Sequence, residues 1–120
     1  MPQENRRSRK IADQVKIEIS WLIDRKIKDP GKGLVTITRV KLSPDLKLAS
    51  VNFSVLGDQE QRKRSEIVLR RSTSFLRREL GMRLNLKYLP ELRFYYDDSM
   101  EYAANISKII KKIHENESNS

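Results

Sequence analysis

Apolar side chains recur at helical spacing between residues 8 and 28. They fall on one face of a helix and belong to Ile11, Ala12, Val15, Ile19, Leu22, Ile23 and Ile27. The pattern predicts an amphipathic helix that stops at Asp29-Pro30, because the residue before a proline avoids the helical region. Ile17 and Trp21 lie on the opposite face, where they form either a local packing pair or a contact surface for a partner.

The pattern changes to alternation after Leu34. Apolar residues 35 and 37 share one parity and residues 40 and 42 the other, so a bulge near Thr38-Arg39 is needed to bring them to one face. A turn at Ser43-Pro44-Asp45 leads into a second alternating run over 49–55, and two strands this close predict an antiparallel hairpin. A third strand is predicted after Pro90, where residues 92, 94 and 96 alternate with Arg93 and Tyr95.

Helical spacing returns after Gly57-Asp58, where Asp58 with Gln61 resembles a capping box. The apolar arc of this helix comprises Val68, Leu69, Ser72, Phe75, Leu76 and Leu80. We expect two helical pieces with a break at Ser72-Thr73-Ser74, because these side chains compete for backbone hydrogen bonds. A last helix opens at Asp98, and its apolar stripe is Tyr102 or Ala103, Ile106, Ile109, Ile110 and Ile113.

The order helix, strand, strand, helix, helix, strand predicts an α+β fold with helices on one face of a small sheet. It resembles the type II KH fold (α-β-β-α-α-β), whose members clamp single-stranded nucleic acid with a GXXG loop between two helices. This chain has no GXXG, and the helix break stands in its place. We expect a basic N-terminal segment over 1–7, a single KH-like RNA-binding domain with a C-terminal helix over 8–113, and a disordered tail over 114–120.

Charge indicates an anionic partner. The 120 residues include 25 Lys+Arg and 16 Asp+Glu, a net charge of +9, and the excess lies in residues 1–28 and 62–93. Two rows on the broken helix repeat every seven residues, Lys63-Arg70-Arg77 and Arg64-Arg71-Arg78, and would each align along a straight axis. The residues expected to contact RNA are Arg6, Arg7, Arg9, Lys10, Lys63, Arg64, Arg70, Arg71, Arg77 and Arg78, with Ser72 and Ser74 at the break. Tyr95 is the one candidate for stacking on a base, but an ordinary surface tyrosine is the favoured interpretation of this residue.

The residue inventory argues against catalysis. The chain has no cysteine and one histidine, His114, which excludes thiolate and histidine-based metal sites, and we expect no cofactor. Asp97, Asp98 and Glu101 could hold a divalent ion, but a turn and helix cap explains them better, because no histidine or lysine base stands nearby. No apolar run reaches the roughly 18 residues that span a bilayer. We therefore expect a cytoplasmic, monomeric, non-enzymatic protein without a membrane partner.

Three strings, in this order and spacing, resemble the ribosome-binding factor A family. They are Lys26-Ile27-Lys28-Asp29-Pro30, Ser43-Pro44-Asp45-Leu46 and Leu89-Pro90-Glu91-Leu92-Arg93-Phe94-Tyr95-Tyr96-Asp97-Asp98-Ser99. In that family an Ala-x-Gly break replaces the GXXG loop of a KH-like fold. Here Ser72 and Ser74 replace both small residues. Serine is small enough to keep a kink but lacks the freedom of glycine at positive φ, so the angle between the helices does not follow from the resemblance.

The resemblance implies a ribosome assembly factor. Such a factor binds the free or immature small (30S) ribosomal subunit, assists late maturation and processing of its 16S rRNA, acts in cold adaptation, and has other assembly factors among its partners. The alternatives are a permanent basic ribosomal protein and a general RNA-binding module. The net acidic C-terminal portion argues against the first alternative, because ribosomal proteins usually carry long basic extensions.

Overall fold

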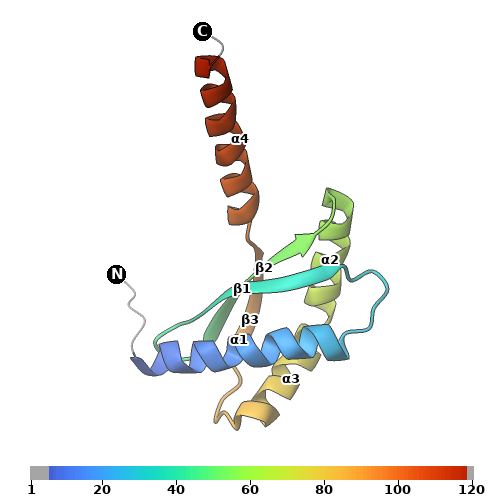
Figure 1. Cartoon of the computed structure of the whole chain (residues 1–120). Helices are drawn as coiled ribbons and strands as arrows, with labels where there is room; N and C mark the ends of the chain where they lie inside the picture. The colour runs from blue at the N-terminus through green and yellow to red at the C-terminus, as the bar shows by residue number, and fades with distance from the viewer. Residues whose placement is uncertain (1–5, 119–120) are drawn as a thin grey trace.

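The computed structural model describes residues 6–118, with the side chains of Met100 and Ser118 excepted. Its elements follow the predicted order (Figure 1), and they are α1 (Arg6–Lys26), β1 (Leu34–Leu42), β2 (Leu48–Leu56), α2 (Gln59–Arg71), α3 (Thr73–Leu84), β3 (Glu91–Tyr96) and α4 (Ser99–Ser118). Residues 1–5 of the expected N-terminal segment lie outside the described residues, whereas Arg6 and Arg7 belong to α1.

The three strands form one sheet in the order β1-β2-β3. β1 pairs with β2 antiparallel, and β2 pairs with β3 parallel, so β3 is an edge strand. The register shifts between Ile37 and Arg39, which confirms the bulge and brings Ile37, Val40 and Leu42 to the buried face.

The core lies between this face and the first three helices. α1 packs against β1 and α3, and α2 packs against β2 and β3. Phe53 is fully buried at the centre, with the rings of Phe94 and Tyr96 edge-on at centroid distances of 6.3 and 5.6 Å. The other face of the sheet carries half-buried polar residues such as Ser50, Asn52 and Ser54. The helices therefore share one face, as predicted.

The predicted helix break lies at Ser72, between α2 and α3. The Asp58 carboxylate accepts from Gln61 N at the start of α2, as the capping pattern predicts. Ser72 has φ −88° and ψ 0°, and positive φ among the described residues occurs at Leu46, Asn85 and Gly57. The break thus needs no left-handed residue, so the two serines meet no backbone strain there.

α4 projects away from the domain as a single helix (Figure 1), and residues 101–117 are all exposed. The expected end at residue 113 is corrected, because the helix continues over 114–118, where the chain has neither glycine nor proline to stop it. Residues 119–120 of the expected disordered tail lie outside the described residues. None of the helices within residues 6–118 combines the length and the apolar composition of a membrane-spanning segment.

Candidate nucleic-acid interface

A hollow of about 330 Å³ lies beside the helix break. It is lined by Arg70 at the end of α2, by Thr73 at the start of α3 and by residues 91–95 of β3. β3 is an edge strand, and its side chains alternate, so Leu92 and Phe94 enter the core while Arg93 and Tyr95 stay exposed. The fold therefore brings cations and an aromatic ring to one polar edge.

Tyr95 and Arg93 form the β3 side of this hollow. Tyr95 is 47% exposed, which suits a residue whose ring stacks on a base. Its hydroxyl, and then the Glu91 carboxylate at 3.4 Å, hold the pKa of Arg93 above its usual value. Arg93 and Thr73 are additions to the residues predicted from sequence. Arg93 shares its parity along β3 with Tyr95, and this spacing was a signal that could have identified it.

The α2 cations that were predicted to contact RNA divide into two groups. Arg64 pairs with Glu60 at 2.7 Å and Arg70 with Glu66 at 3.0 Å, both exposed pairs one helical turn apart. Such pairs contribute about 0.3–0.5 kcal/mol, so a phosphate can replace the carboxylate at little cost. Lys63, Arg71 and, on α3, Arg78 are exposed and form no ion pair with the residues that the structure describes.

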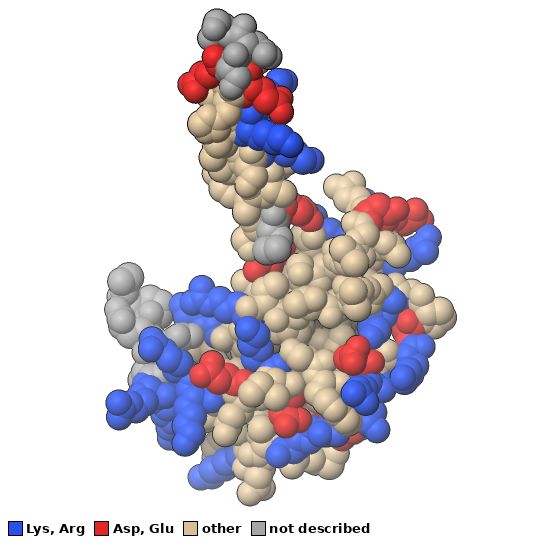
Figure 2. Space-filling view, in the orientation of Figure 1, with Lys and Arg blue, Asp and Glu red and all other residues tan. Residues whose placement is uncertain are grey.

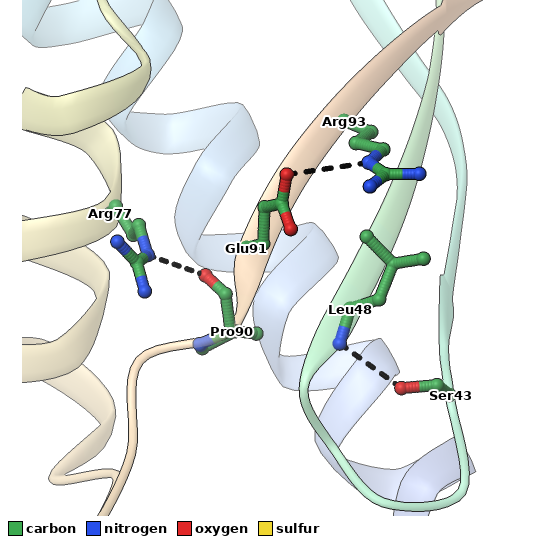
Figure 3. A network of polar contacts seen from close by, with 6 residues as sticks. All are labelled: Ser43, Leu48, Arg77, Pro90, Glu91 and Arg93. Carbon is green, nitrogen blue, oxygen red and sulfur yellow. Dashed lines mark hydrogen bonds and ion pairs between the residues drawn. The ribbon is translucent and has the colours of Figure 1, made fainter.

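Arg77 has a structural role that its sequence pattern did not predict. Its Nε donates to Pro90 O at 2.9 Å and a terminal nitrogen donates to Leu89 O at 3.0 Å. Figure 3 shows this guanidinium reaching from α3 to the residue that precedes β3. Arg77 therefore fixes the start of β3 against α3, and its contact with a phosphate stays a prediction.

Hydrogen bonds connect the last turn of α2 with the first turn of α3 across the break. Ser72 O accepts from Leu76 N at 2.9 Å, and Thr73 Oγ1 donates to Leu69 O at 3.1 Å. Ser72 is half-buried and Ser74 is exposed. Ser74 is thus the serine whose side chain is open to a partner.

The N-terminal cations form a second basic region. Arg6, Arg7, Arg9 and Lys10 are exposed on the first turns of α1, and Figure 2 shows basic side chains gathered at that end, at the lower left. The opposite end of α1 leads to Gly31, which lies against Val68 of α2. The structure therefore does not merge the two predicted groups of cations into one patch.

The acidic residues before α4 act in capping and packing. Asp97 accepts from Thr38 Oγ1 at 2.6 Å and Ser99 N at 2.9 Å, and its bonds to Ser99, then Thr38, lower its pKa to about 2. The Tyr96 hydroxyl donates to Glu101. This hydrogen bond is the first cause, and burial the second, that raises the pKa of Tyr96. Among the described residues no three acidic or histidine side chains are grouped to hold a metal ion.

Trp21 packs locally. The guanidinium carbon of Arg83 lies 4.2 Å from its ring centroid, and Arg83 also pairs with Glu18 at 3.3 Å. This contact fixes α3 to α1 and favours the packing interpretation for Trp21. Ile17 remains 68% exposed.

Comparison with known proteins agrees with this geometry. A family model described as ribosome-binding factor A matches residues 7–110. The chain belongs to the ribosome-binding factor A family. A ribosome-binding factor A from Macrococcus caseolyticus is 40% identical over 107 residues, which cover 89% of this chain and 94% of the relative.

Solved structures of ribosome-binding factor A share the fold, which is KH-like. The solution structure of a putative ribosome-binding factor A from Thermotoga maritima has a TM-score of 0.65 and 31% identity, covering 78% of this chain and 89% of that one. A homology model of the Thermus thermophilus factor, fitted into the cryo-EM map of a 30S complex with that factor, has a TM-score of 0.62 and 27% identity, covering 74% of this chain and 93% of that one.

Proposed function

We propose that this protein is a ribosome assembly factor that binds the free or immature small (30S) subunit and assists late maturation and processing of its 16S rRNA. The observation that carries the proposal is the hollow at the helix break, where Arg70, Arg93 and Tyr95 meet on a domain of the ribosome-binding factor A family. The 30S complex of the Thermus relative supports the choice of partner.

Binding would follow from charge and shape. Arg70, Arg71 and Arg78 would contact phosphates, which position a protein on RNA without reading sequence. Tyr95 would stack on an unpaired base, a contact that tolerates any base. Specificity would then come from the shape of the rRNA around the break.

The remaining features of the proposal concern how the protein acts in the cell. It acts in the cytoplasm as a monomer, through binding alone and without a cofactor, at a step that cold makes limiting. Folded RNA is more stable in the cold, so a factor that holds one rRNA conformation has its largest effect there. Other assembly factors would share the same subunit.

Binding of purified protein to 30S subunits over a range of salt concentrations tests the interface. We expect Arg71→Ala with Arg78→Ala to weaken binding. The slope of log K against log salt concentration should fall by about one to two, because each lost phosphate contact means that about one counterion fewer is released on binding. The matched control, Lys111→Ala with Lys112→Ala, removes the same charge from α4. An equal change in both double variants would contradict the interface, and no binding by the unaltered protein would contradict the function.

A further inference from the structure

A second and larger hollow, of about 750 Å³, lies where the N-terminal turns of α1 meet the β1–β2 turn and the segment before β3. Its volume falls within the roughly 300–1,000 Å³ of small-ligand sites. Its lining combines apolar residues from all three segments with Tyr88 and the cations Arg7, Lys47 and Lys87. We call it the turn groove.

The turn groove has an apolar floor and a cationic rim. Leu42 and Pro90 are fully buried, and Ile11, Leu46 and Leu86 are half-buried. The rim cations Arg7, Lys47 and Lys87 are exposed and form no ion pair with any described residue. Tyr88 stands at the rim, is 73% exposed, and has Lys87 Nζ 5.4 Å from its ring centroid.

The one carboxylate that lines the groove already accepts two hydrogen bonds. Asp45 accepts from Ser43 Oγ at 2.6 Å and from Lys47 N at 3.0 Å, and these bonds, in that order, lower the pKa of Asp45. Asp45 therefore belongs to the turn, and the groove keeps a positive rim suited to an anion.

The walls of the groove are fixed before any ligand arrives. Ser43 N donates to Leu48 O at 2.9 Å, and Leu48 N donates back to Ser43 Oγ at 3.0 Å (Figure 3). On the other wall, Leu89 packs so closely on α3 that a Cβ at Gly81 would lie 1.9 Å from Leu89 Cδ2. Arg77 holds the same wall through Leu89 O and Pro90 O.

We propose that the turn groove binds unpaired nucleotides of RNA, with the base on the apolar floor or against Tyr88 and the phosphates on Lys47, Lys87 and Arg7. Stacking on an apolar or aromatic surface beside cations is how proteins hold single-stranded RNA. The assignment rests on the proposed function only for the source of the RNA.

An extended acidic peptide fits less well. Such a peptide binds through unpaired backbone groups at a strand edge. At this groove two backbone donors are already bonded, since Leu46 N bonds to Ser43 O at 2.8 Å and Glu91 N to Lys47 O at 2.8 Å. A nucleotide needs none of them, because its base stacks and its phosphate meets side-chain cations.

The two hollows are adjacent along the chain. Pro90 lines the turn groove and the next residue, Glu91, lines the hollow at the helix break (Figure 3). One RNA strand that follows β3 can therefore occupy both, with phosphates at Arg93 and Arg70 at one end and at Lys47 and Lys87 at the other.

Fluorescence anisotropy with a short unstructured oligouridylate, titrated into the full chain at several salt concentrations, tests the groove. We expect Tyr88→Ala to weaken binding about ten-fold, the loss of one stacked base, and Tyr88→Phe to keep it. Lys47→Ala with Lys87→Ala should lower the salt slope by about one to two. Tyr88 is exposed, so thermal unfolding of these variants should match that of the unaltered protein.

Two results would overturn the groove while leaving the proposed function standing. One is unchanged oligouridylate binding in the Tyr88 and Lys47/Lys87 variants together with a loss in Arg71→Ala with Arg78→Ala. The other is an NMR titration of the RNA-free protein in which oligoglutamate shifts the amide signals of Leu86 and Lys87 and oligouridylate does not. That result would assign the groove to an acidic peptide. Retention of 30S binding by all of the variants would contradict both assigned surfaces, whereas absence of 30S binding by the unaltered protein would contradict the function.

Discussion

At the scale of single residues, the two arginines of the row Lys63-Arg70-Arg77 have different structural roles. Arg70 pairs with Glu66 on the surface, whereas Arg77, seven residues later, bonds to two carbonyls before β3. A regular repeat therefore does not imply a shared role. The i,i+4 pairs could have been read from the spacing of Glu60 with Arg64 and Glu66 with Arg70, because side chains one turn apart meet.

The structural role of Arg77 predicts a loss of stability. Arg77→Ala should lower the free energy of unfolding by about 1–2 kcal/mol, because two charge-assisted bonds to carbonyls are lost at a partly exposed site. Arg78→Ala, on the same turn and without such bonds, should change it by less than about 0.5 kcal/mol. Urea unfolding of both variants measures this. Equal stability of the two variants would show that Arg77 does not fix the start of β3.

At the scale of elements, the helix break follows from ordinary backbone conformation. Ser72 takes φ −88°, and Ser74 is a helical residue of α3. Glycine at position 74 would therefore offer no relief and would only add backbone freedom to the unfolded chain.

We expect Ser74→Gly to destabilise the protein by about 0.5–1 kcal/mol, the usual cost of glycine in a helix. Ser74→Ala is the control and should be neutral or slightly stabilising, because alanine favours helix. Thermal unfolding of both variants gives the comparison. A gain in stability with Ser74→Gly would mean that the break requires a positive φ.

Elements were also the level at which sequence patterns predicted most. The bulge between Ile37 and Arg39, the cap at Asp58 and the break at Ser72 are local, so the spacing of neighbouring residues was sufficient. The hollows were not predictable, because each combines residues far apart in the chain, such as Arg7 with Tyr88 or Arg70 with Tyr95. Only the packed fold sets those distances.

At the scale of the whole molecule, the cations that border the two hollows lie in two places. One is the helix break with β3, and the other is the N-terminal end of α1 with the turn groove. The start of β3 joins them, since Pro90 and Glu91 border one hollow each. The division favours an extended RNA contact over a single point of attachment.

Sedimentation of a cell lysate through a sucrose gradient at low and moderate salt, with this protein detected in each fraction, tests the assembly-factor function most directly. We predict a peak with free small subunits that moves to the top of the gradient as salt rises, since phosphate contacts weaken with salt. A fixed one-to-one presence in complete ribosomes at both salt concentrations would contradict it and indicate a permanent ribosomal protein. A position at the top of the gradient even at low salt would contradict ribosome binding itself.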